Sequence, residues 1–208
     1  MKLKTICLIL LVLSACDDKE SNNESPVVNN DPPAISNDVT GCRTGYPQQT
    51  TSEYNLPYTP NSEFVVGQGN CTDGSHTVEV DQEYAYDFDM PIGTDIVATK
   101  AGTVAVVVED FTENNNTPGE ENYLIIQHND GTISGYYHLT QDGITVEVGD
   151  TVSQGDIVAQ SGNTGDSSGA HLHFEVALCE DCKTLPVNFK NTREHNNGLI
   201  EGESYKAE

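Results

Sequence analysis

Short segments in which apolar and polar residues alternate recur along the chain from about residue 63 onward. The clearest is HLHFEV at 171–176, where apolar side chains occupy every second position and His171, His173 and Glu175 lie between them. A period of two residues is typical of a β-strand with one buried and one polar face. Strands are predicted at 63–66, 95–99, 103–109, 122–128, 132–138, 145–148, 156–160 and 171–178, the last of which extends this segment by two residues.

The composition and spacing of these segments predict the fold class. They are rich in Val, Ile, Thr and Tyr and are separated by Gly and Asp-Gly turn signals, as in hairpins. No amphipathic helical pattern of useful length accompanies them. We therefore expect an all-β, antiparallel, sheet-rich single domain, in which the polar stretch 111–122 is a solvated loop at a hairpin end.

The beginning of the chain carries a targeting pattern. MKLKTICLILLVLSAC combines two lysines, a short apolar run and a small-residue ending, which is typical of an export signal. The ending LSAC resembles the bacterial lipobox, which implies cleavage before Cys16 and lipid attachment to it. We expect a signal peptide at 1–15, a disordered polar tether at 16–40, and a β-rich domain at 41–208 with its core at 64–177.

The chain is strongly acidic. Nine Lys and Arg residues stand against 33 Asp and Glu residues, which gives a formal net charge of −24 at pH 7. Such a surface repels phosphate backbones. Nucleic-acid binding is therefore not expected, although acidity alone identifies no substrate.

Four cysteines fall within the predicted domain: Cys42, Cys71, Cys179 and Cys182. An even number in an exported chain indicates two disulfides. Pairing Cys42 with Cys71 and Cys179 with Cys182 is favoured, because the second pair closes a local loop and the first fixes the start of the domain. A zinc site at the second pair is a weaker alternative, since structural zinc usually takes two such pairs.

His171 and His173 project from the same face of their predicted strand, about 6 to 7 Å apart. One imidazole can therefore bind a metal while the other reaches a molecule bound to that metal. A catalytic zinc site needs three protein ligands and one open position. Because an isolated His-x-His also suits a solvated strand face, other segments of the chain must decide between the two interpretations.

The chain carries three blocks in this order: GSHTVEVDQEYAYDFDMPIGTDIVA, IIQHNDGTISGYYHL and SGNTGDSSGAHLHFEV. They combine an aspartate before an apolar MPIGT turn, a Tyr-His-Leu, and a glycine-rich loop that leads into His-Leu-His-Phe. Over about residues 64–177 the chain resembles the lysostaphin and LytM-type zinc endopeptidases, which cut peptidoglycan cross-links. The resemblance implies the catalytic fold of that family and one Zn²⁺ per chain.

By this resemblance the zinc ligands are His76, Asp87 and His173, with a fourth position left for water. The commoner family spacing places the first histidine four residues before the aspartate, where this chain has Glu83. His76 lies in a Ser-His pair that some relatives carry after a Gln-Gly segment. We expect His76 rather than Glu83 to be the first ligand, with the choice left open at this point.

The same resemblance implies that His138 and His171 are the catalytic pair. One imidazole takes a proton as zinc-bound water attacks the carbonyl, and the other stabilises the developing negative charge. How these roles divide is open. His128, before a turn, and His195, in a polar tail, are expected to be structural or exposed, and Glu175 is expected either beside a zinc ligand, in a salt bridge or in solvent.

These expectations describe a zinc metalloendopeptidase that hydrolyses peptide bonds in peptidoglycan cross-links or stem peptides. It would be exported, held to a membrane of the bacterial envelope by lipid on Cys16, and monomeric. Two alternatives are a non-enzymatic relative that binds cell wall or activates an amidase, and a protease that acts on proteins. The presence of every expected ligand and catalytic side chain favours the enzyme, without identifying the bond cleaved, the membrane or any activating partner.

Overall fold

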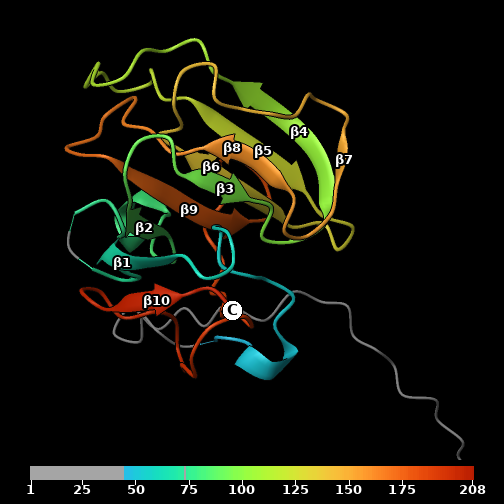
Figure 1. Ribbon diagram of the computed structural model, residues 1–208. Coiled ribbons are helices and arrows are strands. Elements are labelled where there is room, and N and C mark those ends of the chain that lie inside the picture. The colour runs from blue at the N-terminus through green and yellow to red at the C-terminus, as the bar shows by residue number, and fades with distance from the viewer. Residues whose placement is uncertain (1–44, 73) are drawn as a thin grey trace, which may run out of the picture. The chain divides into compact units, whose positions relative to one another are not determined.

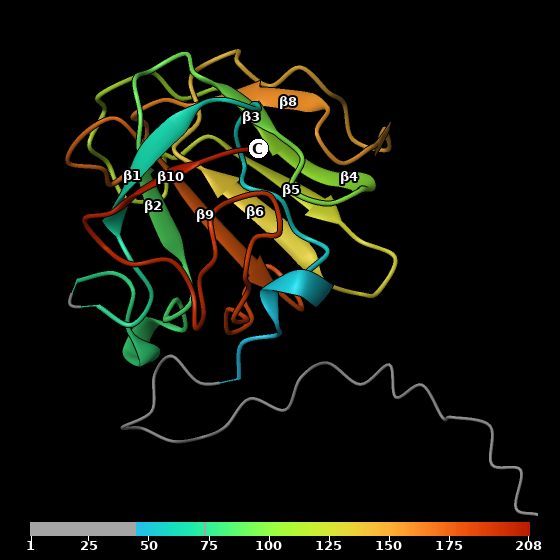
Figure 2. The same cartoon turned by 60° about the horizontal axis from the view of Figure 1, so that its bottom comes forward.

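Antiparallel β-strands dominate the computed structural model, which describes residues 45–72 and 74–208 (Figures 1 and 2). The eight-stranded sheet has the order β10-β1-β2-β9-β6-β5-β4-β7. Its strands are β1 Glu63–Gln68, β2 Tyr86–Asp89, β4 Gly102–Val108, β5 Tyr123–Gln127, β6 Ile133–Tyr137, β7 Thr151–Val152, β9 His171–Ala177 and β10 Ser204–Lys206. A second, two-stranded sheet pairs β3 Asp95–Val97 with β8 Ile157–Gln160. The expected all-β, antiparallel fold class is therefore confirmed.

Helical structure in the described residues is confined to two short 3-10 turns, η1 Gln49–Thr51 and η2 Val78–Val80. Within residues 45–72 and 74–208, no helix is long and apolar enough to cross a bilayer. The predicted signal peptide, the tether and Cys16 lie outside the described residues.

One face of the large sheet forms the hydrophobic core. In β9, Leu172, Phe174 and Val176 are buried among core residues, as the alternating pattern predicts. The β3–β8 ribbon contributes Ile96 and Val158 to the same core, and it lies over this face of the sheet (Figure 1). The histidines of β9 therefore project from the opposite face.

The strand prediction was wrong at 145–148 and missed β2. The segment 145–148 is not a strand, because the Asp150 side chain accepts a hydrogen bond from the backbone N–H of Glu147 and forms a turn there. β2, which contains Asp87 and was not among the predicted strands, pairs on both sides. His195, expected to be structural or exposed, has a structural role: it is buried and its Nε2 accepts a hydrogen bond from the backbone N–H of Phe189.

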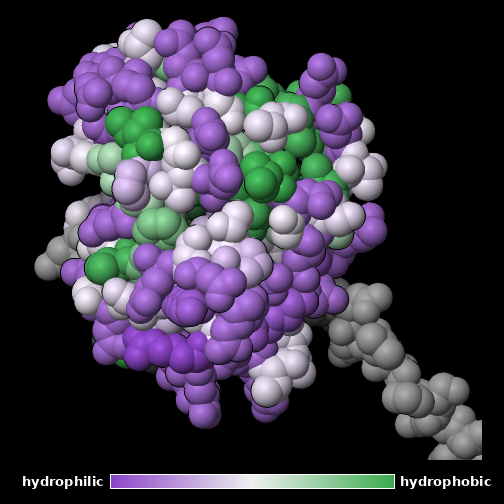
Figure 3. Space-filling model, viewed as in Figure 1, coloured by the Kyte–Doolittle hydropathy of each residue, from purple (hydrophilic) through white to green (hydrophobic). Residues whose placement is uncertain are grey.

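Cys179 and Cys182 form the predicted local disulfide. Its companion, the predicted Cys42–Cys71 pair, includes Cys42, which lies outside the described residues. The surface seen in Figure 3 is largely hydrophilic, with a smaller group of apolar side chains over the region of β4 and β8.

Candidate metal centre and active-site cleft

Three neighbouring strands present polar side chains in one row on the face opposite the core. Asp87 of β2 is directly opposite His173 of β9, which is in turn opposite Tyr137 of β6. Because opposed residues in an antiparallel sheet point to the same face, these three side chains meet. The register is held by the buried neighbours Phe88 and Leu172, which oppose each other on the core side.

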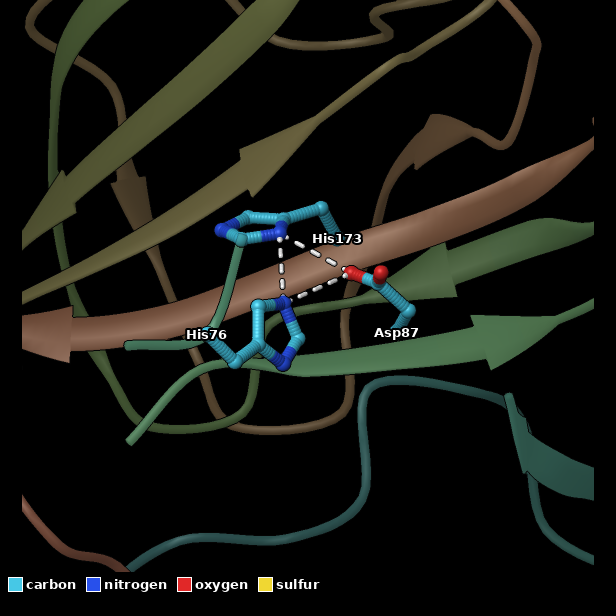
Figure 4. A group of neighbouring side chains, drawn as sticks. All are labelled: His76, Asp87 and His173. Atoms are coloured by element: carbon cyan, nitrogen blue, oxygen red, sulfur yellow. Dashed lines mark hydrogen bonds and ion pairs between the residues drawn. The ribbon is translucent and has the colours of Figure 1, made fainter. Parts of the chain in front are cut away.

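His76 reaches this row from the loop that follows β1. Its ring is fully buried, and its Nδ1 lies 3.0 Å from the carbonyl oxygen of Gly69. Since a carbonyl oxygen only accepts hydrogen bonds, Nδ1 carries the hydrogen and a neutral ring has its lone pair on Nε2. That Nε2 points at Asp87 and His173, as Figure 4 shows.

The three side chains bring potential metal-binding atoms close together. The distances are 2.9 Å from Asp87 Oδ1 to His173 Nδ1, 3.3 Å from Asp87 Oδ1 to His76 Nε2, and 3.4 Å between the two ring nitrogens. Nitrogen and oxygen ligands about 2.0–2.1 Å from a tetrahedral zinc ion lie roughly 3.3–3.4 Å from one another. Two imidazoles and one carboxylate at these separations fit zinc in both donor type and spacing.

The electrostatics of the cluster suit a cation. Burial by itself would raise the pKa of Asp87, but hydrogen bonds from His173 and His76 outweigh burial and hold that pKa well below its ordinary value. Burial by itself would lower the pKa of His173, yet hydrogen bonds to Asp87 and Glu175 raise it to about 10. In the metal-free protein, a proton on His173 therefore supplies the positive charge that a bound metal ion would otherwise provide.

His138 and His171 lie beside the cluster with their ring centroids 4.6 Å apart. His138 Nδ1 donates to the carbonyl oxygen of Thr164 over 2.7 Å, and His171 Nδ1 donates to that of Gly169 over 2.8 Å. Each neutral ring is thereby left with its lone pair on Nε2. His171 Nε2 is 3.8 Å from Asp87 Oδ1, so this pair and the potential metal ligands share one site.

Burial, followed by the positive charge of His171 and His173, lowers the pKa of His138 to about 4. Its imidazole is therefore neutral at neutral pH and can accept a proton. His138 follows the last residue of β6 with a left-handed backbone, φ 61°, which few residues other than glycine adopt. The tight backbone turns the side chain toward His171 instead of continuing the strand.

Asp87, His138, His171 and His173 border a cleft of about 540 Å³, and His76 lies buried behind Asp87 and His173. One wall is the loop before β9, which supplies the carbonyl groups of Thr164 and Gly169. The polar stretch 111–122 is more than a solvated loop, because Asn115 Oδ1 accepts a hydrogen bond from the Gly165 backbone N–H over 2.7 Å and Glu113 Oε2 accepts one from Asn163 over 2.6 Å. The insertion thus supports the loop that holds both histidines.

Other residues considered from the sequence lie elsewhere. Glu83 is buried but is not among the described potential ligands that cluster with Asp87 and His173. The ring of His128 contacts Ala101 O and Ser134 Oγ, which is the structural role expected. Sequence reasoning missed Tyr137 and the carbonyl groups that fix the histidine rings. Tyr137 could have been found from the strand alternation, whereas backbone acceptors leave no sequence signal.

The chain is similar in sequence to proteins that include a peptidoglycan endopeptidase and lysostaphin. It is 39% identical over 102 residues to the peptidoglycan DD-endopeptidase ShyA of Vibrio cholerae, a match that covers 49% of this chain and 21% of that one. It is 39% identical over 93 residues to lysostaphin of Staphylococcus simulans, covering 44% and 17%. The chain thus spans about a fifth of the length of these relatives.

Two solved structures are similar to part of the chain. A zinc-containing peptidase from Vibrio cholerae has 31% identity and a TM-score of 0.44, over 64% of this chain and 38% of that one. Lysostaphin from Staphylococcus simulans has 27% identity and a TM-score of 0.48, over 65% and 51%.

The family model for peptidase family M23 matches residues 81–188, more than half of the chain. The matched segment contains Asp87, His138, His171 and His173, whereas His76 lies five residues before it. On this match the chain belongs to peptidase family M23.

Proposed function

We propose that the chain is a zinc-dependent endopeptidase that hydrolyses peptide bonds in the cross-links or stem peptides of peptidoglycan. The observation that carries the proposal is the convergence of His76, Asp87 and His173, with the His138–His171 pair beside them at the cleft. Family membership and relatives named peptidoglycan endopeptidases support the choice of substrate. A cell-envelope location follows from that substrate.

His76, Asp87 and His173 would hold the zinc ion, which supplies Lewis acidity and lowers the pKa of water when bound. The chain's own residues would carry out the proton transfer and stabilise the developing charge. His138, neutral and with its lone pair on Nε2, can take a proton as the scissile carbonyl is attacked. His171, whose ring lies against His138, can in its protonated form donate from Nε2 and stabilise the charge that develops on the carbonyl oxygen. The two roles are interchangeable on geometry.

The alternatives are weaker. A non-enzymatic relative would not need three potential metal ligands beside a histidine pair, and the presence of both groups in this chain supports the enzyme. A protease for proteins would use the same chemistry. A lipid anchor at Cys16, as predicted from the sequence, would favour the cell wall as substrate, because it would keep the enzyme close to the wall. Cys16 lies outside the described residues.

The test is metal analysis together with digestion of purified peptidoglycan, on the parent chain and on His173→Ala. We expect about one zinc per parent chain and release of soluble peptides, with both lost in His173→Ala. His128→Gln, altered at a histidine away from the cleft, should keep both. A folded parent chain that binds no zinc and releases nothing would favour the non-enzymatic alternative, and cleavage of casein without release from peptidoglycan would favour a protein substrate.

A further inference from the structure

A buried carboxylate lies behind His173, on the side away from the metal cluster. Glu175 follows two residues later on the same face of β9 and is only 5% exposed. Its Oε2 is 3.5 Å from His173 Nε2, while His173 Nδ1 faces Asp87 at 2.9 Å. The two nitrogens of one imidazole therefore each face a carboxylate.

The surroundings of Glu175 do not otherwise compensate its charge. Burying a carboxylate costs free energy unless an opposite charge and hydrogen bonds accompany it. In the part of the chain that the structure describes, its ion pair is with His173 and its other side-chain hydrogen bond comes from Tyr137. A cation bound at Nδ1 of His173 would supply positive charge that stabilises the Glu175 carboxylate from the other side of the imidazole ring.

Tyr137 and Gly135 hold Glu175 in place. The Tyr137 hydroxyl donates to Glu175 Oε1 over 3.3 Å. Gly135 is opposite Glu175 in the sheet, and a Cβ at Gly135 would lie 2.6 Å from Cε2 and 3.0 Å from the hydroxyl oxygen of Tyr137. Because Gly135 has no side chain, the Tyr137 ring can lie over its own strand and reach Glu175.

We infer that Glu175 is a positioning residue that orients His173 toward the metal. A neutral imidazole carries one hydrogen. Glu175 accepts it at Nε2, which leaves the lone pair on Nδ1 and fixes the plane of the ring. The inference rests on the proposed function, because it concerns a ligand of the same metal site.

The cleft contains a matched pair that serves as a control. The Tyr123 hydroxyl donates to Glu180 Oε1 over 3.0 Å, as Tyr137 does to Glu175. The rings of Tyr123 and Tyr137 stack with centroids 5.4 Å apart. Glu180 is exposed, however, and its hydrogen bond is to Tyr123 rather than to a potential metal ligand.

The experiment measures zinc affinity by competition with a chelator, and records the visible spectrum of the cobalt-substituted protein. We expect Glu175→Ala to bind zinc about 10- to 100-fold more weakly. Glu175→Gln, which keeps an acceptor oxygen, should recover part of the loss, and Tyr137→Phe should lose less than Glu175→Ala. The cobalt bands should change in both Glu175 variants, because the orientation of a ligand changes. Glu180→Gln and Tyr123→Phe should match the parent chain in both measurements.

Unfolding of the metal-free variants shows whether they are folded. If Glu175→Ala does not fold, Glu175→Gln and Tyr137→Phe decide the question. Folded Glu175 variants with parental zinc affinity and parental cobalt spectra would overturn the inference. Failure of the proposed function would give a different result. A parent chain that binds zinc but releases no peptides from peptidoglycan would refute the proposed function. The effect of Glu175 on zinc affinity could still be measured in that case.

Discussion

Asp87 and His173 lie directly opposite each other in β2 and β9, with 2.9 Å between Oδ1 and Nδ1, although 86 residues separate them in the sequence. The core sets this register: Tyr86 opposes Phe174 and Phe88 opposes Leu172, and all four are buried. A slip of one residue would move the polar side chains into the core. The hydrophobic packing on one face of the sheet thereby fixes the geometry of the proposed metal ligands on the other.

Asp87→Asn should bind zinc far more weakly than the parent chain, by more than the roughly 10- to 100-fold that outer contacts contribute. The amide has nearly the same shape but lacks the negative charge that faces His76 and His173. Chelator competition measures the loss. Asp89→Asn, two residues along the same strand and exposed, is the control and should stay within about twofold. Equal affinities for the two variants would exclude Asp87 as a ligand.

His138→Asn should separate hydrolysis from metal binding. Asparagine tolerates the left-handed backbone found at this position better than most residues, so the variant should fold. Loss of the imidazole should reduce peptide release by about 10²- to 10⁴-fold, while zinc content stays that of the parent. A turnover assay beside metal analysis checks both. Peptide release within tenfold of the parent rate would contradict a catalytic role for His138.

The metal-free protein should be most stable near pH 6.5. His173 has a pKa of about 10 in the folded state against 6.5 as the ordinary value, so the folded state binds more protons between these values and stability falls as pH rises through them. His138 has a lowered pKa of about 4. The unfolded state then binds more protons between about 4 and 6.5, and stability also falls as pH drops through that range.

Urea unfolding in excess chelator, at about pH 5, 6.5 and 9, measures this dependence. His173→Gln should lose the decline on the alkaline side, because the group with the raised pKa is gone. A parent chain that becomes steadily more stable from pH 6.5 to 9 would show that His173 is not held protonated by Asp87 and Glu175.

The Cys179–Cys182 disulfide should contribute modestly to stability. It joins cysteines three positions apart, and the chain-entropy model assigns such a short loop about 2 kcal/mol. The double variant Cys179→Ser, Cys182→Ser should therefore unfold at a lower urea concentration, with its zinc affinity unchanged. A large loss of zinc affinity would instead show that the loop supports the metal cluster.

The strand pattern predicted most of the fold because a period of two residues is a local property. The alternation in β9 assigned both faces of that strand correctly, and the composition of the segments gave the antiparallel class. Short strands were harder to predict from the sequence. β10 has three residues and is a strand because it pairs with the edge strand β1, a contact between segments about 140 residues apart that no local pattern contains.

The sequence by itself determined the chemistry available: two histidines on one strand face, an aspartate before an apolar turn, and a third block with Tyr-His-Leu. The tertiary structure alone decided that His76 and not Glu83 joins Asp87 and His173. Spacing cannot settle that choice, because a loop has no fixed period. The path from Gly69 to His76 depends on hydrogen bonds such as that from His76 Nδ1 to Gly69 O, and these form only when the strands around the loop are already packed.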